Sequence, residues 1–435
     1  MKFIIDIEKE EYEKFVKSHK KSHFLQSYAW GEFSKISRGL IPHYLGVKNE
    51  SDKLVAATLL LQKKLPLGYS YFYSPRGFVV DFEDNELLGF FTNKLISYIK
   101  KFRAIFLKID PDIVMSSKNY KDEDNNLEYD PQVIFNNLKK LGFKHLGFTK
   151  NFETMQPRYT FRIDMNKSLE EIKNNFSKTT KQRIKKAESL NTKVRIGTEK
   201  DISTFYNLMT ITENRKKFIS HNLEYYENLY KIYNKENKFI LFMGSINIKD
   251  IIKKYESELN EYNIELEKLS GENLSKTLNN KKKELQRQIF SHQKLIEEYK
   301  EYNKELGDEI TLNAHAIIIY GEKAWVIYAG NHNILTSTYS NYKTYEEHIN
   351  YCYENGIKLY DQFGTIGDLS KDNPRFGLHE FKKKFGGDYI EFMGEWDYIV
   401  NKPMYILFTK LVPLYRKIIR NRSIKELNNE IRGNN

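Results

Sequence analysis

The sequence predicts a mixed α/β fold that is duplicated along the chain and interrupted by a long helical hairpin. Strand-like segments alternate with helical segments in two successive cycles, one within about the first 150 residues and one from 158 to 400. The second cycle is interrupted between about 249 and 306 by charged residues arranged around a heptad repeat of apolar ones. Two cycles of similar order with one insertion therefore indicate a duplicated α/β fold.

The first cycle opens with segments rich in β-branched and aromatic residues, which are typical of strands, at 43–48, 53–62 and 69–82. A helix over about 85–101 follows, and then a buried strand over 104–111. The polar stretch 116–130 is predicted to be a loop. The next helix is predicted to run from Pro131 through Leu141, because proline is favoured in the first turn of a helix.

The second cycle is predicted to hold three helical segments between 168 and 234 and one helix over about 342–355. Its strands fall on both sides of the insertion, at 158–165, 237–248, 313–320, 324–330, 358–364 and 389–400. The triplet Gly321-Glu322-Lys323 is predicted to be a hairpin turn between two of these strands.

The insertion is predicted to form two helices whose apolar side chains recur at alternating spacings of three and four. These are Ile252, Tyr255, Leu259, Tyr262, Leu266 and Leu269 in the first helix, and Leu285, Ile289, His292, Ile296 and Tyr299 in the second. The repeat breaks near either Ser270-Gly271 or Asn279-Asn280. Such helices bury their stripes against each other as an antiparallel coiled coil, and roughly 25 to 30 residues per helix would project about 40 Å. An arm of this length is not needed to complete a core, which suggests a large partner.

The net charge of +12 and the pI near 9.1 indicate polyanionic partners, such as nucleic acid, phosphorylated substrates or an anionic membrane. Part of this basicity reflects a chain that is rich in Lys, Asn, Ile and Tyr throughout, as proteins from AT-rich genomes are. The single cysteine, Cys352, excludes an intrachain disulfide framework and a Cys-based zinc cluster. No metal and no cofactor are expected. The acidic N-terminal segment and the lack of a long apolar run predict a cytoplasmic protein.

Five motifs stand in a fixed order along nearly the whole chain: FLQSYAWGEFSK (24–35), YSPRGFVVDF (73–82), FLKIDP (106–111), VIYAGN (326–331) and HEFKKKFGGDYIEFMGEWDYIVNKPMY (379–405). Together with the coiled-coil arm, they resemble the FemABX family, the aminoacyltransferases that build interpeptide bridges in bacterial peptidoglycan. The resemblance implies two GNAT-like acyltransferase subdomains. Their predicted bounds are 1–155 for the first and 156–248 with 307–402 for the second, beside an arm at 249–306 and a C-terminal amphipathic helix and tail at 403–435.

The implied reaction moves an aminoacyl group from aminoacyl-tRNA to an amine on the stem peptide or bridge of a lipid-linked peptidoglycan precursor. An enzyme of this kind must orient the amine against an ester carbonyl, stabilise the developing oxyanion and remove a proton. No G-x-S-x-G elbow is present, so direct attack without a covalent intermediate is expected. Further implied partners are the cytoplasmic membrane surface and a second copy of the chain or a related transferase.

Phe381 and Lys382 match the Phe-Lys pair of the family, which makes them the predicted catalytic residues. A lysine near the carbonyl can stabilise the oxyanion or protonate the leaving oxygen, and Phe381 would shape and dry the site. The alternative is that Lys382, Lys383 and Lys384 form an ordinary solvated basic turn.

Five residues are predicted to bind substrate: Lys35, Arg215 and Tyr328 from the resemblance, and Arg76 and Asp110 from their own surroundings in the sequence. Lys35 would hold the precursor's diphosphate, and Arg215 and Tyr328 would contact the precursor. Arg76 would contact phosphate or carboxylate, or else order the turn before Gly77. Asp110 ends a buried strand, where α/β sheets place ligands. Binding of the acceptor amine is favoured over acceptance of its proton, because deprotonation can also run through solvent or substrate. For these positions a solvated lysine or arginine, a turn aspartate and a buried strand tyrosine stay as alternatives.

A short basic helix is predicted to bind tRNA phosphates through Lys178, Lys181, Arg183, Lys185 and Lys186. The alternative is a solvated helix whose Ile184 and Ala187 face the core. After Pro403 the chain alternates bulky apolar and basic residues around Pro413, which indicates either an interfacial membrane helix or a helix docked on the second subdomain.

The chain departs from the family at Phe392, where a tyrosine is common, and Tyr389 is the nearest candidate to supply the missing hydroxyl. Two other functions stay open: an acyl-CoA-dependent N-acyltransferase, and a non-catalytic RNA-binding or scaffold protein. Acyl-CoA enzymes of this fold cradle pyrophosphate on a Gly-rich loop that enters a helix. The segment at 364–373 follows a strand but lacks that pattern, which favours tRNA as the donor.

Overall fold

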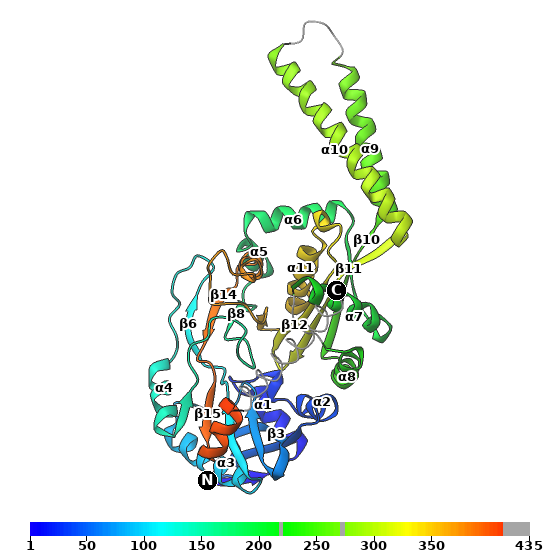
Figure 1. Cartoon of the computed structure of the whole chain (residues 1–435). Coiled ribbons are helices and arrows are strands. Elements are labelled where there is room, and N and C mark those ends of the chain that lie inside the picture. The colour runs from blue at the N-terminus through cyan, green and yellow to red at the C-terminus, as the bar shows by residue number, and fades with distance from the viewer. Residues whose placement is uncertain (217–220, 270–274, 412–435) are drawn as a thin grey trace, which may run out of the picture.

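The computed structural model describes residues 1–216, 221–269 and 275–411 and places two mixed β-sheets side by side (Figure 1). The first sheet has the order β1-β2-β3-β4-β5-β15-β7. Its strands are β1 (Lys2–Ile5), β2 (Ile41–Lys48), β3 (Leu54–Lys64), β4 (Ser70–Ser74), β5 (Ala104–Ile109), β7 (Phe143–His145) and β15 (Trp396–Ile399). The predicted strands of the first cycle all lie in this sheet.

The second sheet has the order β6-β14-β8-β13-β12-β11-β10-β9. Its strands are β6 (Val114–Lys118), β8 (Tyr159–Asp164), β9 (Lys193–Ile196), β10 (Phe239–Asn247), β11 (Glu309–Tyr320), β12 (Lys323–Asn331), β13 (Leu359–Asp361) and β14 (Asp388–Phe392). β11 and β12 form the predicted hairpin, with Tyr320 opposite Lys323. β13 follows in parallel to β12, so the carboxyl end of β13 lies within the second sheet.

The two sheets exchange strands. β6 follows β5 directly in the chain but pairs with β14 in the second sheet, and β15 inserts between β5 and β7 in the first. The prediction of one strand over 389–400 is therefore wrong, because the chain leaves the second sheet after Phe392 and enters the first at Trp396. Gly394, with a φ of +90°, provides the turn between them. The predicted loop over 116–130 is wrong in its first residues, which belong to β6.

Helices cover the sheets. Capping residues set where helices begin and end, and the apolar pattern sets which face packs on the sheet. Around the first sheet lie α1 (Lys9–Ser18), α2 (Tyr28–Arg38), α3 (Asn85–Lys100) and α4 (Pro131–Lys140). α4 begins at Pro131 as predicted, with the Asp130 side chain capping its first turn. Around the second sheet lie α5 (Leu169–Asn174), α6 (Lys178–Ser189), α7 (Ile202–Lys216), α8 (Leu223–Tyr233), α11 (Ser340–Glu354) and α12 (Phe376–Lys383). Four α-helices thus occupy the described part of 168–234, where three were predicted.

One apolar core joins the two sheets. It combines Phe24 and Trp30 from the first part of the chain with Leu229 of α8 and Trp325 of β12. The Phe24 ring lies 5.2 Å from that of Trp325. Because large aromatic side chains are shared across the junction, the sheets are fixed against each other rather than joined by a linker alone. The subdomain bounds at 155 and 402 stay predictions.

The predicted arm consists of α9 (Ile248–Glu267) and α10 (Lys276–Leu306), which pack against each other and project from the second sheet (Figure 1). Its base is apolar, with Tyr255 and Tyr299 both buried. His292 lies on the seam and contacts Glu258 at 2.8 Å. The alternative break at Asn279-Asn280 is wrong, because both residues lie inside α10. The other alternative, Ser270-Gly271, lies outside the described residues.

The described start of the C-terminal segment, α13 (Lys402–Ile406) and residues 407–411, packs on the first sheet. Tyr405 is buried against Phe106 of β5, and its hydroxyl donates to Asp397 at 2.8 Å. Docking on the second subdomain was one of the predicted alternatives and is wrong for these residues. Pro413 and the residues beyond it lie outside the described part of the chain.

Candidate functional site

Two of the sequence motifs meet at Gln26, which is buried between α2 and the first sheet. Its side-chain oxygen accepts a hydrogen bond from the Leu59 backbone at 2.8 Å. Its amide nitrogen donates to the Pro75 carbonyl at 2.6 Å and to the Ser74 hydroxyl at 3.2 Å. Gln26 therefore fixes the Ser74–Gly77 turn, and the FLQSYAWGEFSK motif supports the SPRG motif through space.

A third motif reaches the same turn through Asp110, directly after β5. The Asp110 carboxylate accepts from the Tyr73 hydroxyl at 2.7 Å and from the Arg76 backbone N–H at 2.6 Å. Its side chain is 2% exposed, and no ion pair joins it to a cation among the described residues. Burial raises the pKa of Asp110 to about 6, against the opposing effect of Arg76 and Tyr73. This carboxylate is held in place, but no cation among the described residues lies within ion-pair distance of it.

Arg76 turns its own side chain toward the second sheet. The guanidinium donates to the Pro157 carbonyl at 2.6 Å and stacks on the Phe392 ring at 4.2 Å. Its backbone has a φ of +53°, in the left-handed region. The Arg76 backbone N–H thus takes part in the turn through Asp110, while the side-chain Nε finds no partner among the described residues.

Phe392, the departure from the family pattern, lies between two guanidiniums. The Arg162 guanidinium faces the ring at 4.8 Å, in addition to that of Arg76. An aromatic ring at this position therefore supports two cations without a hydroxyl. Tyr389 lies elsewhere on β14 and donates to the Ile366 carbonyl at 2.9 Å.

The three remaining substrate-binding predictions lie near the junction of α2, α7, α8 and β12. Tyr328 is half-buried on β12, with its hydroxyl 2.9 Å from that of Tyr225 on α8. Lys35 is exposed on α2, and Arg215 is exposed in the last turn of α7. Arg38, one turn after Lys35, donates to Tyr225 at 2.9 Å. Sequence reasoning missed Arg38, whose position three residues after Lys35 on one helix was the available signal.

Lys382, the predicted catalytic lysine, is buried rather than solvated, so the basic-turn alternative is wrong for it. Its ammonium donates to the carbonyls of Gln362, Phe363 and Gly364 at 2.7, 2.9 and 2.8 Å. Burial lowers the pKa of Lys382 to about 7, and the charge of Asp361 opposes that shift. Three carbonyl acceptors match the three N–H donors of an ammonium, so they too favour the charged form.

Phe381 packs away from that cage, into the core of the second sheet. Its ring lies 5.0 Å from Tyr342 and 4.9 Å from Tyr345, both of which come from α11. Phe381 and Lys382 therefore connect α12 to two different neighbours. Phe381 packs against α11, and Lys382 bonds to the turn after β13.

Comparison with known proteins decides the family. The FemAB family model matches residues 7–412. The chain belongs to the FemAB family. It is 32% identical over 400 residues to the aminoacyltransferase FemA of Staphylococcus epidermidis, covering 90% of this chain and 95% of that protein. It is 31% identical over 418 residues to FemA of Staphylococcus aureus, covering 94% and 98%.

The crystal structure of FemX superimposes with a TM-score of 0.74 at 30% identity, covering 94% of this chain and 99% of that chain. The predicted fold class, two GNAT-like parts of mixed α/β structure with an inserted helical hairpin, is thereby confirmed. Membership of the FemAB family also confirms the predicted enzyme class, a tRNA-dependent aminoacyltransferase of peptidoglycan bridge synthesis.

In this FemAB protein the cations of α6, the predicted tRNA-binding helix, form two sets: those bonded within the protein and those exposed to solvent. Lys181 donates to the Asn174 carbonyl at 3.0 Å, Arg183 bonds to the Tyr342 hydroxyl, and Lys186 donates to the Tyr255 hydroxyl of the arm at 3.2 Å. Lys178 and Lys185 are exposed. Ile184 and Ala187 face the core, as the alternative prediction of a solvated helix expected.

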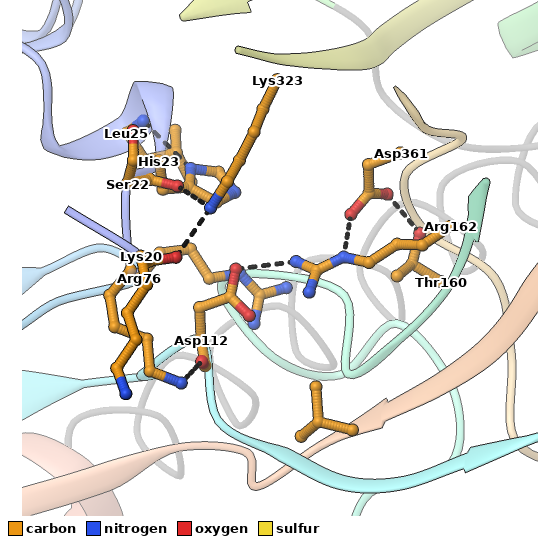
Figure 2. Close-up of polar contacts among 12 residues, drawn as sticks. Lys20, Ser22, His23, Leu25, Arg76, Asp112, Thr160, Arg162, Lys323 and Asp361 are labelled. Carbon is orange, nitrogen blue, oxygen red and sulfur yellow. Dashed lines mark hydrogen bonds and ion pairs between the residues drawn. The ribbon is translucent and has the colours of Figure 1, made fainter. Parts of the chain in front are cut away.

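A partly buried cluster of charged residues that the sequence did not predict lies at the junction of the two sheets (Figure 2). We call it the junction network, consisting of Asp112, Arg162, Asp361, Lys21 and Lys323. Arg162 donates to Asp112 at 2.7 Å and to Asp361 at 2.8 Å. These contacts hold the pKa of Asp112 well below its usual range.

Two lysines complete the junction network from its edges. Lys323 donates to the carbonyls of Lys20 and Ser22 at 2.8 and 3.1 Å, which ties the second-sheet hairpin to the loop after α1 (Figure 2). Burial lowers the pKa of Lys323 to about 8. Lys21 donates to the Asp112 carbonyl at 3.1 Å. Asp361, at the carboxyl end of β13, had the same sequence signal as Asp110 and could have been found by it.

Within the part of the chain that the structure describes, no group of three or more His, Cys, Asp or Glu side chains lies close enough to hold a metal ion. In residues 1–216, 221–269 and 275–411, no helix combines the length and the apolar composition needed to cross a bilayer.

Proposed function

We propose that this chain transfers an amino acid from aminoacyl-tRNA to an amine on the stem peptide or bridge of a lipid-linked peptidoglycan precursor, at the cytoplasmic face of the membrane. Membership of the FemAB family supports the reaction class. The observation that carries the proposal at the level of the site is Asp110, a buried carboxylate that three motifs hold in place and that lacks a counterion.

A buried carboxylate without a cation is costly unless a ligand supplies the charge. Tyr73 and the Arg76 backbone use one oxygen each, and an ionised carboxylate has further acceptor sites. An amine that arrives as an ammonium would pair with Asp110 and lose its proton before attack. Because the pKa of Asp110 is about 6, the group is mostly ionised at neutral pH and can receive that proton.

The role of Lys382 at the reacting carbonyl stays part of this proposal. Its ammonium already has three carbonyl acceptors, so one of those bonds must open before it can donate to an oxyanion. The pKa of about 7 makes proton donation to a leaving ribose oxygen accessible at neutral pH. With the three bonds closed, Lys382 supports the turn that follows β13.

For the tRNA we propose Lys178 and Lys185 as the phosphate contacts on α6, because they are the two predicted cations there that stay exposed. Lys181, Arg183 and Lys186 are already bonded within the protein. For the lipid-linked acceptor, Ile406, Leu407 and Leu411 leave 42%, 41% and 51% of their surface exposed near the end of the described chain. Such apolar side chains favour contact with a membrane surface.

The test is mass spectrometry of lipid-linked precursor incubated with the protein, tRNA, synthetases and an amino-acid mixture. The expected result is a mass gain of one amino-acid residue that ribonuclease abolishes. A parallel reaction with acetyl-CoA alone should give no gain, and gain there alone would replace the proposal with an acyl-CoA-dependent transferase. A precursor that already carries a first bridge residue is tested beside the bare one, so that either acceptor is detected.

The matched variant is Asp110→Asn, which preserves size and removes the charge. Its amide oxygen can still accept from the Arg76 backbone N–H, while its NH2 group can only donate to the Tyr73 hydroxyl, so that bond reverses direction. We expect turnover to fall by about 100-fold or more, in line with the loss of a positioned base. Unchanged turnover in this variant would remove Asp110 from the reaction while leaving the transferase itself standing.

A further inference from the structure

At one end of the first sheet, β3 and β15 finish and β4 and β5 begin. Lys63 of β3 pairs with Tyr71 of β4, and β4 runs parallel to β5 from this end. Ile399 of β15 lies opposite Phe106 of β5. Segments far apart in the sequence therefore meet here, and we call the surface that they form the basic end: 63–71, 97–106 and 399–411.

Every charged side chain in the three segments of the basic end is basic. They contain no Asp or Glu, and their exposed cations are Lys64, Lys100, Lys101, Arg103, Lys402 and Lys410. None of these forms an ion pair within residues 1–216, 221–269 and 275–411. At the other end of the sheet, the cavity between the β2–β3 hairpin and the start of α3 is lined instead by Glu50, Asp84 and Glu86. Positive charge is thus concentrated at one end of this sheet.

An open cavity of about 320 Å³ lies at the basic end. Its wall is made by Tyr69, Lys100, Arg103, Ala104, Val400 and Asn401, so the described lining holds two cations and no carboxylate. The Arg103 guanidinium stacks on the Tyr69 ring at 4.3 Å and donates one N–H to the Leu67 carbonyl at 2.8 Å. Its other N–H groups are available to an anion, and stacking holds the guanidinium in place for it. The cavity therefore suits a phosphate group.

The tip of the β3–β4 hairpin displays an apolar side chain beside this cavity. Leu67 is 82% exposed, and its φ of +59° lies in the left-handed region. Arg103, which bonds to the Leu67 carbonyl, has a φ of +50°. Such backbone is uncommon for residues of either type, so the tip holds an unfavourable conformation in which Leu67 adds little to the core. Three more exposed apolar side chains come from the C-terminal segment: Ile406, Leu407 and Leu411.

We propose that the basic end docks the protein on an anionic membrane, with Lys100 and Arg103 at a lipid phosphate and Leu67 in the apolar layer. Cations that surround exposed apolar side chains are the combination that binds anionic bilayers. The inference deepens the proposed function and rests on it for the lipid-linked substrate, but membrane affinity can be measured without any transfer. The alternative, cations that only complement the C-terminal end of α3, does not account for Lys64, Lys402 or the exposed leucine.

The position of the basic end fits a lipid-linked acceptor. β5 runs from Ala104, in the wall of the cavity, to Ile109, directly before Asp110. At about 3.3 Å per residue, the strand places Asp110 about 20 Å from the basic end. The lipid of the precursor could then stay in the bilayer while its peptide extends to Asp110. The first sheet also lies at the end of the molecule opposite the arm, so membrane docking leaves the arm accessible (Figure 1).

The first test is co-sedimentation of the full-length protein with phosphatidylcholine vesicles, with and without about one third of phosphatidylglycerol. The wild-type protein should bind the anionic vesicles and not the neutral ones. Leu67→Glu should lower the affinity by about tenfold or more, because it removes an apolar contact and adds a negative charge. Arg103→Gln combined with Lys100→Gln should lower it by about 25-fold, since each cation near an anionic surface contributes about fivefold.

Each variant has a matched control. Phe290→Glu replaces a side chain that is 72% exposed on the arm, far from the basic end. Lys178→Gln combined with Lys185→Gln removes the same charge as the double variant, from exposed positions on α6. Both controls should bind anionic vesicles as tightly as the wild type does. Equal losses in the controls and the test variants would show a general effect of charge and polarity and overturn the proposal.

The second test separates docking from the reaction. With lipid-linked precursor in anionic vesicles, Leu67→Glu should raise the KM by about tenfold and leave kcat unchanged. With a precursor from which the lipid has been removed, its KM should equal that of the wild type. A wild-type protein that transfers the amino acid but does not bind anionic vesicles would overturn the docking proposal alone. One that binds the vesicles but transfers nothing would count against the proposed function alone.

Two other occupants of the basic end would give different results. If the double variant of Lys100 and Arg103 lost affinity for tRNA and kept its affinity for vesicles, the surface would contact nucleic acid. If Leu67→Glu changed a dimer into a monomer in sedimentation velocity without lipid, the surface would contact a second copy of the chain. Either result would overturn membrane docking, whereas unchanged tRNA affinity and an unchanged sedimentation coefficient are expected.

Discussion

Asp110 and Asp112 lie two residues apart in one buried loop, yet their surroundings are opposite. Asp112 is paired with Arg162 inside the junction network, and its pKa lies well below the usual range. Asp110 has a hydroxyl and a backbone N–H but no cation, and its pKa rises to about 6. The difference shows that the partner, rather than burial, separates a structural aspartate from one that can bind or take a proton.

The same contrast separates two cations. Lys382 has three acceptors for three N–H groups and is complete without a substrate. Arg38 has five N–H groups and one acceptor among the described residues. We call a charged group saturated when the protein supplies a partner for each of its hydrogen bonds. Substituting a saturated group should mainly lower protein stability, and substituting an unsaturated group should mainly lower ligand affinity. Substitutions at each can break or sharpen this distinction.

The largest effect on stability is expected for Arg162→Met. The change leaves Asp112 and Asp361 buried without their cation, which should lower the free energy of unfolding by about 3 to 5 kcal/mol. Urea titration measures this. Arg195→Met is the matched control, because Arg195 pairs with Asp201 at the surface and should cost no more than about 1 kcal/mol.

The pH dependence of stability tests the cause of that loss. Asp112 has a folded-state pKa below its unfolded value, so its contribution is present above about pH 4 and disappears as the pH falls below that value. Arg162→Met should lose this part of the acid sensitivity, because the carboxylate is no longer paired. An unchanged slope between pH 2 and 5 would mean that Arg162 does not set the pKa of Asp112.

The second effect in size is expected for Lys382→Met. Three carbonyls around the turn after β13 would lose their donor, which should lower the free energy of unfolding by about 2 to 4 kcal/mol. Lys383→Met, which removes an exposed pair with Asp122, should cost less than about 1 kcal/mol. If Lys382→Met lost turnover with no loss of stability, the saturated lysine would be a catalytic group that releases a carbonyl during the reaction.

The sequence predicted the elements better than the contacts. Periodicity and proline placement located α4 and the helical arm, because these signals are local. The split of 389–400 was missed because both halves are strands with the same alternation, and their sheets are chosen by distant partners. The turn at Gly394 between two runs of apolar residues was the one local sign of it.

The candidate site was likewise predicted only in part. Asp110 and Lys382 were found from motifs and lie at buried, organised positions, although their predicted roles stay proposals. Arg162 was not found, because its partners are 50 and 199 residues away and only the fold brings them together. Arg38 was not found because an arginine near a helix end is usually solvated, and its isolation from carboxylates is visible only in three dimensions.

The third effect sharpens the contrast between the two aspartates. Asp110 has a folded-state pKa above its unfolded value, so ionising it disfavours the folded state, and its contribution to stability declines as the pH rises from about 4 to 6. Asp110→Asn should remove this decline and leave the protein about 1 to 3 kcal/mol more stable than the wild type at pH 7. Urea titrations of both proteins from pH 4 to 7 measure the difference. Equal slopes in the two proteins would show that Asp110 ionises as freely as an exposed carboxyl group.

The smallest effect on stability is expected for the exposed cations of α6. Lys178 and Lys185 are exposed, so replacing both with Gln should leave stability within about 0.5 kcal/mol of the wild type. If they bind tRNA phosphates, the slope of log affinity against log salt should fall by about 1 to 2. Filter binding of tRNA between 50 and 200 mM salt measures that slope, because a slope smaller by 1 to 2 changes the loss of affinity across this range by about 4- to 16-fold.

Lys186→Gln is the matched control for this pair, because Lys186 lies on the same helix and carries the same charge but donates to Tyr255 at the base of the arm. It should leave the salt slope unchanged and weaken the contact between α6 and α9 instead. A reduced slope in Lys186→Gln equal to that of the exposed pair would mean that bonded and unbonded lysines contribute alike. Binding would then depend on the total charge of α6, and the distinction between saturated and unsaturated cations would fail at this surface.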